Sequence, residues 1–348
     1  MDTTILRCPA CGSQLQFNAL TQNWVCDSCG NTYNEKDVAQ ITTDSNLDTK
    51  THGQDIDNQP ALNLFRCQSC GAEMVSDENT TATFCVYCGN PGIMKSRLEG
   101  KYRPDKIIPF KKTKEDAIEA YNKCRLGKPF APPEFGKPEN IEKISGIYIP
   151  FWLYDGLSRA YVSGTSTEYT SWSKGDYRYT RTDTYHVERL ANMGFKNVPA
   201  DASVKFDDAT MDSIEPYDFN ELQKFNYSYL SGFLAEKFDV TAADDQSRAQ
   251  SRMENSIMAS IRNTIKGSFS SAEETKTTVF DKVQYALLPV WMLNTIIDGK
   301  TYTFAMNGQT GRLVGNIPTS AKQILKFFLI RAAIAMAVLS LLAYWMFM

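Results

Sequence analysis

Two stretches of the chain show the residue patterns of β-strands. Residues 177–187 read YRYTRTDTYHV and alternate with period two, which predicts a half-exposed strand after a turn at 174–176. Residues 147–154 form a dense apolar and aromatic run. A second β block spans 277–315 and contains Asn307-Gly308, a strong signal for a hairpin turn. The sequence IPFWL at 149–153 resembles LPVWM at 288–292, which leaves an internal duplication open.

Helical patterns lie before and between these β blocks. Thr113-Lys-Glu-Asp116 has the form of a capping box and predicts a helix to about Arg125. Cys124 would lie on its apolar face, so we interpret it as a buried helix residue rather than a reactive thiol. Prolines at 129, 132, 133 and 138 predict an extended connection.

Two further helices are predicted between the β blocks. The first would begin at Asp218 and continue to about Phe238, with four apolar side chains facing inward: Leu222, Phe225, Tyr229 and Phe233. The second would begin at Thr241 and end at Gly267, with a stripe of Met253, Ile257, Ile261 and Ile265. We therefore expect residues 95–320 to form an α+β domain with an antiparallel sheet and inserted helices.

The last part of the chain is apolar. Residues 327–348 carry a single charge, Arg331, and as a helix they would extend about 33 Å, which is enough to cross a bilayer core. Lys322 and Lys326 precede them and no charge follows. We predict a transmembrane helix at 324–348 in a single-pass, tail-anchored protein of the cell membrane, with its N-terminal bulk in the cytosol. The alternative is a core helix of a soluble protein or of an oligomer.

The start of the chain contains a repeated cysteine pattern. The form C-x2-C-x14-C-x2-C occurs twice, and each cysteine of the second copy lies 59 positions after its equivalent in the first. Arg7, Gly12, Gly30 and Asn31 also recur at that offset. The first copy contains Cys8, Cys11, Cys26 and Cys29, and the second contains Cys67, Cys70, Cys85 and Cys88.

This spacing is that of zinc ribbons, in which two tight turns direct four thiolates at one ion. Because each set supplies all four ligands, we expect two structural Zn²⁺ ions with no open position for catalysis. The predicted modules are zinc ribbon 1 at residues 1–35 and zinc ribbon 2 at 64–94, joined by a flexible acidic linker at 36–63. A disulfide framework is the alternative, and metal analysis separates the two.

Composition narrows the functional classes. Eight of nine cysteines belong to the repeated pattern, which indicates a reducing compartment, and the net charge of −3 gives no overall attraction to nucleic acid. Residues 1–94 carry 11 acidic and 4 basic residues, whereas 95–112 carry 7 basic and 2 acidic ones. The basic strip is either a solvated connector or a contact for acidic lipid headgroups.

No catalytic motif is evident in the sequence. The two histidines, His52 and His186, have neither metal-site nor nucleophile–base spacing, and there is no phosphate-binding glycine loop. Acidic residues are plentiful, but a single sequence does not reveal which of them converge. We therefore assign no catalytic residue.

The chain resembles a family of double zinc-ribbon proteins with a C-terminal membrane anchor from low-GC Gram-positive bacteria. The resemblance rests on the CxxCG pairs and on four further motifs: YIPFW at 148–152, IEPYD at 214–218, YLSGFLAE at 229–236 and NGQTG at 307–311. Members are often labelled as having a transcription-factor-IIB-type zinc ribbon. The resemblance implies envelope-associated protein partners of the phage-shock or flotillin-like type.

Three functions follow from these patterns. The favoured one is a membrane-anchored adaptor that binds protein partners at the cytoplasmic face. The second is a nucleic-acid-binding protein, which the acidic ribbons disfavour because phosphate contacts need Lys and Arg. The third is an enzyme or thiol sensor that uses the CxxC pairs.

Overall fold

The computed structural model describes residues 6–44, 63–67, 71, 73–76, 85–86, 93–97, 104–297 and 300–347. Within these ranges the fold is mixed α+β, with a large sheet, a small three-stranded sheet and one apolar C-terminal helix. The predicted α+β class is therefore correct. What we call the first cysteine module, residues 6–33, contains the small sheet. Its strands are β1 (Leu15–Asn18), β2 (Asn23–Cys26) and β3 (Thr32–Tyr33).

The large sheet has eleven strands in the described residues. Its main path runs β10-β7-β12-β8-β11-β5-β4-β6, with β13 beside β12, β14 beside β13 and β9 beside β8. The long strands are β8 (Ser145–Lys174), β9 (Tyr177–Asp201) and β12 (Ser268–Ile297). The others are β4 (Asn63–Cys67), β5 (Glu73–Ser76), β6 (Ile93–Arg97), β7 (Lys106–Ile107), β10 (Gln223–Lys224), β11 (Leu234–Glu236), β13 (Lys300–Asn307) and β14 (Leu313–Gly315).

The sheet is mixed rather than purely antiparallel, so the antiparallel prediction is wrong in part. β11 pairs with β8 in parallel, and β7 pairs with β12 in parallel. The short strands β7 and β11 are far in sequence from the strands with which they pair. No hairpin turn connects either pair, so tertiary packing sets their direction. Residues 147–154 lie at the centre of this sheet. Alternate side chains there belong to two core clusters, which explains the unbroken apolar run.

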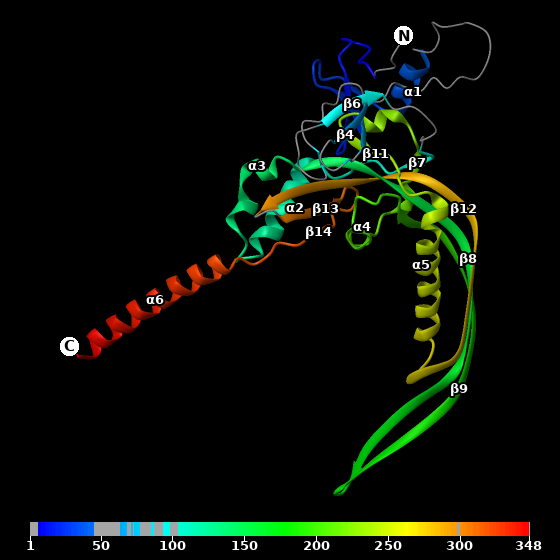
Figure 1. Cartoon of the computed structure of the whole chain (residues 1–348), viewed down its shortest axis with the longest axis vertical. Coiled ribbons are helices and arrows are strands. Elements are labelled where there is room, and N and C mark those ends of the chain that lie inside the picture. Colours follow the sequence, from blue (N-terminus) through cyan, green and yellow to red (C-terminus); the bar gives the residue numbers. More distant parts are fainter. Residues whose placement is uncertain are drawn as a thin grey trace.

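The three long strands form an arm. Figure 1 shows β8, β9 and β12 curving away from the body, with α5 (Ala242–Asn263) along the concave side. At about 3.3 Å per residue, a strand as long as β8 reaches roughly 100 Å along its contour. Helix α5 packs on the arm through Met253, Ile257 and Ile261, which confirms the predicted stripe.

Several local predictions are confirmed. Thr113 and Asp116 make the reciprocal capping-box hydrogen bonds of α2 (Lys114–Leu126), and Thr241 caps α5. Gly175, with φ of +61°, lies in the turn between β8 and β9. The turn after Asn307 links the antiparallel strands β13 and β14, and the Asn307 side chain accepts hydrogen bonds from the amides of Gln309 and Thr310.

The predicted helix from 218 to 238 is wrong. Asp218 does cap a turn, but only the 3-10 turns η2 (Phe219–Glu221), before β10, and η3 (Tyr227–Leu230), between β10 and β11, form here. Gly232 has φ of +88°, a left-handed conformation that does not continue a helix. The aromatic side chains instead reach different surfaces, because Phe233 stacks on Phe110 while Tyr229 packs on the first cysteine module.

Two extended or flexible segments are also partly helical. Helix α1 (Glu35–Asp44) covers the beginning of the predicted linker, since the Asn34 side chain caps it and Val38 is buried. The rest of that linker, residues 45–62, lies outside the described residues. The proline-rich connection contains the 3-10 turn η1 (Pro133–Gly136) and the short helix α3 (Pro138–Ile141), because proline is tolerated in a first helical turn. Helix α4 (Asp208–Ile214) and helix α6 (Ala321–Phe347) complete the described helices.

Candidate functional site: the cysteine modules and their mounting

Two tight turns build the first cysteine site. The amide of Gly12 donates to the carbonyl oxygen of Cys8 at 2.8 Å, and the amide of Gly30 donates to that of Cys26 at the same distance. Both glycines have left-handed φ angles, +74° and +73°, which residues with a Cβ adopt only at a cost. The CxxCG spacing thus produces two matching turns, each of which presents a pair of sulfur atoms.

The four sulfur atoms converge. The Sγ atoms of Cys8, Cys11, Cys26 and Cys29 all lie within 4.8 Å of one another. The Cys8–Cys29 distance is 3.5 Å and the Cys11–Cys26 distance is 3.4 Å. A disulfide requires about 2.05 Å, whereas tetrahedral Zn²⁺ with Zn–S near 2.3 Å places sulfurs about 3.8 Å apart. The cluster therefore fits a four-coordinate metal ion and not a pair of disulfides.

Hydrogen bonds around Cys8 favour its thiolate. The Tyr33 hydroxyl donates to Cys8 Sγ at 3.1 Å, and the amides of Ala10 and Cys11 add to this effect. Although burial opposes them, together they lower the pKa of Cys8 to about 6. The pKa of Cys29 moves the other way, because the lowering effect of the Asn31 backbone is outweighed by burial and by contacts with the other three thiols, which raise it to about 12. Metal binding requires thiolates, so a cation would displace the protons that the four thiols otherwise share. Sequence reasoning missed Tyr33, because nothing in the cysteine spacing indicates which aromatic residue reaches a ligand.

The second copy of the pattern is described only in part. Cys67 and Cys85 are buried, while Cys70 and Cys88 lie outside the described residues. Gly71 has φ of +73°, and its amide donates to the Cys67 carbonyl at 3.0 Å, as Gly12 does to Cys8. We call the described residues of 63–86 the second cysteine module. The φ angle of Gly71 and its hydrogen bond thus match those of Gly12.

The first cysteine module is docked on the body of the protein. Phe17, Trp24 and Tyr229 form a triangle of rings with centroids 5.1–5.2 Å apart. Trp24 Nε1 donates to the Ser228 carbonyl at 3.0 Å, and the Ser231 hydroxyl donates to the Leu15 carbonyl. Trp24 is 1% exposed, so this contact is part of the core and not a loose surface approach.

One described helix, α6, is long and apolar enough to cross a membrane; its apolar stretch is Ala321–Ala343. None of this stretch is buried against the rest of the protein. Its beginning is attached to the body, because the Ser320 amide donates to the Phe130 carbonyl at 2.8 Å and the Phe130 and Phe327 rings are 5.3 Å apart. The Arg331 guanidinium lies 4.8 Å from the centre of the Phe327 ring. These contacts hold the body close to the N-terminal end of the apolar helix.

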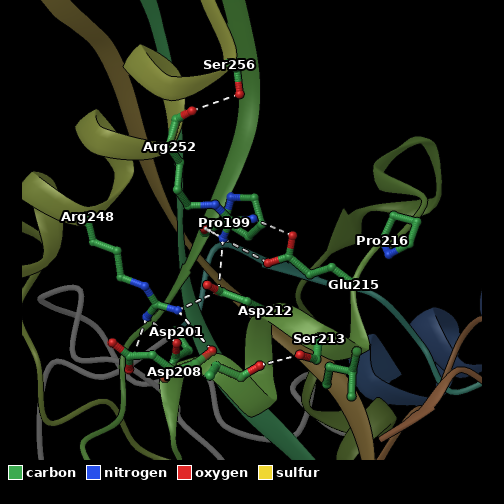
Figure 2. A network of polar contacts seen from close by, with 12 residues as sticks. Pro199, Asp201, Asp208, Asp212, Ser213, Glu215, Pro216, Arg248, Arg252 and Ser256 are labelled. Atoms are coloured by element: carbon green, nitrogen blue, oxygen red, sulfur yellow. Dashed lines mark hydrogen bonds and ion pairs between the residues drawn. The ribbon is translucent and has the colours of Figure 1, made fainter. Parts of the chain in front are cut away.

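A cluster of charged residues joins α5 to the base of the arm (Figure 2). Arg248 contacts Asp201 and donates to Asp212 at 2.6 Å, while Arg252 binds both carboxylate oxygens of Glu215 at 2.5 and 2.9 Å. Burial raises the pKa of Asp201 despite the opposing effect of Arg248. Because the carboxylates are arranged around two guanidinium groups, this cluster is suited to holding α5 in place rather than to acid–base chemistry.

The other reactive groups that the sequence offered do not come together within the described residues. His186 lies on an exposed stretch of β9, 3.2 Å from Glu188, and His52 lies outside the described residues. Cys124 lies on α2 as predicted, but it is half-buried rather than buried. Among the described residues, the cysteine cluster of the first module is the one group that can hold a metal ion.

Comparison with known proteins gives one informative relative. The chain is 33% identical over 325 residues to the "Uncharacterized protein YdjG" of Bacillus subtilis (strain 168), and the alignment covers 92% of each chain. No family model and no solved structure matches the chain.

Proposed function

This chain belongs to the family that includes the Bacillus subtilis protein YdjG, and we propose that it is a membrane-anchored zinc adaptor that binds protein partners. The observation that carries the proposal is the four-sulfur cluster of the first module. Its donor set is complete, so a bound ion would hold the module in shape and leave no position for a substrate. A closed metal site of this kind provides a rigid surface for recognition.

We assign two Zn²⁺ ions to the chain. Cys8, Cys11, Cys26 and Cys29 would hold one ion, and a second would be held by the equivalent set of Cys67, Cys70, Cys85 and Cys88. The matching turns at Gly12 and Gly71 support the second assignment. Zinc would supply folding energy to segments that are too short to hold a core alone.

We assign α6 as a single-pass anchor of the cell membrane, with residues 1–320 on the cytosolic side. Lys322, Lys326 and Arg331 at its N-terminal end support this orientation by the positive-inside rule. The contact between Phe130 and Phe327 would keep the body at the membrane surface, where tethering raises the effective concentration of a partner. Phage-shock-type and flotillin-like membrane proteins are the first partners to examine.

Photo-crosslinking from intact membranes tests the adaptor. Leu20 is 70% exposed at the turn between β1 and β2, so a photoactivatable residue placed there would face a partner of the first module. We expect a protein adduct that disappears in Cys8→Ser and persists in Cys124→Ser, since only Cys8 is a metal ligand. A nucleic-acid adduct would favour the nucleic-acid-binding alternative. An adduct that is unchanged in Cys8→Ser would show that the zinc module is not the docking element.

A further inference from the structure

The exposed aromatic side chains of the described residues fall into two groups. One group is on the apolar helix α6 and comprises Phe327, Phe328 and Trp345. The other is at the end of the arm and comprises Tyr169, Trp172, Tyr177, Tyr179 and Tyr185, each between 44% and 72% exposed. We call residues 168–185, which contain this second group, the hairpin tip. Because aromatic residues are usually buried, their gathering at one projecting end requires an explanation.

No described part of the chain covers the hairpin tip. Strand β12 begins at Ser268, opposite Thr167, and α5 ends at Asn263, so neither reaches beyond the start of the tip. Beyond that point, β8 and β9 are the only described strands, and they are joined by the turn at Gly175. A two-stranded hairpin is marginally stable in water. A contact outside the chain would stabilise this segment.

The aromatic residues are arranged on the hairpin as a compact surface. Trp172 and Tyr179 are directly opposite in the register, and their rings stack at 5.7 Å with an interplanar angle of 13°. Tyr177 and Tyr185 share the face of Tyr179 on β9, since they are separated from it by even numbers of residues. Tyr169 lies on the opposite face of β8. The end of the hairpin thus presents aromatic rings on both sides.

Charge and position indicate the kind of partner. The tip carries Lys174, Arg178 and Arg181 against three acidic residues, and Arg181 is paired with Asp183 at 2.8 Å. Trp and Tyr interleaved with polar and basic residues are typical of the membrane–water interface, where the rings enter the headgroup region and their polar atoms stay hydrated. Figure 1 shows the hairpin tip and α6 projecting from the body away from the first cysteine module.

We propose that the hairpin tip is a second membrane contact, in which Trp172, Tyr177 and Tyr179 enter the interfacial region of the bilayer that α6 spans. This inference rests on the proposed membrane anchoring. Two separated contacts would fix the orientation of the body on the membrane and hold the first cysteine module facing away from it. Because the charges of the tip balance, the contact depends on the aromatic rings and not on lipid charge.

The test uses the full chain reconstituted into phosphatidylcholine vesicles. The photoactivatable residue p-benzoylphenylalanine replaces Tyr177, and two matched variants carry it at Leu190 and at Phe328. Leu190 is 74% exposed on the same strand but lies towards the middle of the arm, and Phe328 lies in α6. After illumination, we expect lipid adducts at Tyr177 and Phe328 and none at Leu190. Adding phosphatidylglycerol to the vesicles should leave the yield at Tyr177 unchanged.

Two results would overturn the inference. One is a lipid adduct at Phe328 with none at Tyr177, and the other is an adduct between Tyr177 and a second copy of the chain. The first shows that the tip stays in water, and the second shows that the arm is a protein interface. Loss of the Phe328 adduct, together with extraction of the protein by alkaline carbonate, would instead contradict the proposed membrane anchoring.

Discussion

The two cysteine modules share one ligand spacing but are held in the protein in different ways. The first has its own three-stranded sheet and docks through Phe17 and Trp24 on Tyr229. The second contributes β4 and β5 to the large sheet, where β5 pairs with β11. Its buried Cys67, Met74 and Cys85 belong to the same core cluster as residues of β8. Equal spacing thus determines a local turn, whereas the surrounding apolar residues determine how a module is held.

The sequence differences at equivalent positions explain this contrast. Trp24 and Phe17, which dock the first module, correspond at the offset of 59 to Thr83 and Ser76. Tyr33, which contacts Cys8, corresponds to Gly92. At these positions, the second copy therefore lacks the aromatic residues that dock the first module on the body. We infer that the first module is the more separable unit and the second is part of the folding core.

The largest expected effect is that of Cys8→Ser. Loss of one ligand should release the proposed Zn²⁺ ion of the first module, and structural zinc contributes about 10 kcal/mol or more to the folding of such a segment. Metal analysis of the detergent-solubilised chain should fall from about two zinc ions to about one. Cys124→Ser is the matched control and should retain both. If Cys8→Ser loses all zinc, the ligand sets cross between the modules.

Trp24→Ala should detach the first module from the body while leaving its metal in place. Removal of a fully buried tryptophan costs about 3–5 kcal/mol, and here the hydrogen bond to Ser228 is lost as well. We expect faster amide hydrogen exchange in η3 and the first module, with the zinc content unchanged. Leu20→Ala, at an exposed position of the same module, should have no effect. Unchanged exchange in Trp24→Ala would contradict the docking contact.

Met74→Ala and Leu15→Ala compare equivalent positions directly. Both residues are 0% exposed, and each truncation should cost about 2–5 kcal/mol. The location of the effect should differ, because Met74 lies in the large sheet and Leu15 in the small one. We expect hydrogen exchange to increase in β8 and β11 for Met74→Ala, and mainly within residues 6–33 for Leu15→Ala. Equally local effects would show that the second module is not part of the cooperative core.

The smallest expected effect is that of Tyr33→Phe. It removes one hydrogen bond to a ligand sulfur and should weaken zinc binding by the first module about 10- to 100-fold. Competition with a chromophoric chelator measures this affinity. The difference in affinity between the two modules should also change by that factor, since the second has Gly92 at the equivalent position. A Tyr33→Phe variant with unchanged affinity would show that the hydroxyl does not support the metal site.

Sequence reasoning succeeded where the relevant neighbours are close in the chain. The capping box at Thr113, the Thr241 cap, the turn at Gly175 and the convergence of the first four cysteines all follow from short spacings. It failed at residues 218–238, where apolar residues at helical spacing pack against different parts of the protein instead of forming one face of a helix. Phe233 meets Phe110 and Tyr229 meets Phe17, partners from distant parts of the chain.

The sequence by itself determined the CxxCG turn at Gly12, helices α2 and α5 and the apolar C-terminal helix, because each depends on interactions over a few residues. Only the tertiary structure decided how each module packs on the rest of the protein and which acidic residues surround Arg248 and Arg252. It also decided that the tyrosines of the hairpin tip remain exposed. These outcomes depend on which distant surfaces meet, and burial of apolar area is a non-directional force that no local spacing encodes. The alternating pattern at 177–187 predicted a strand, and the fold left that strand projecting.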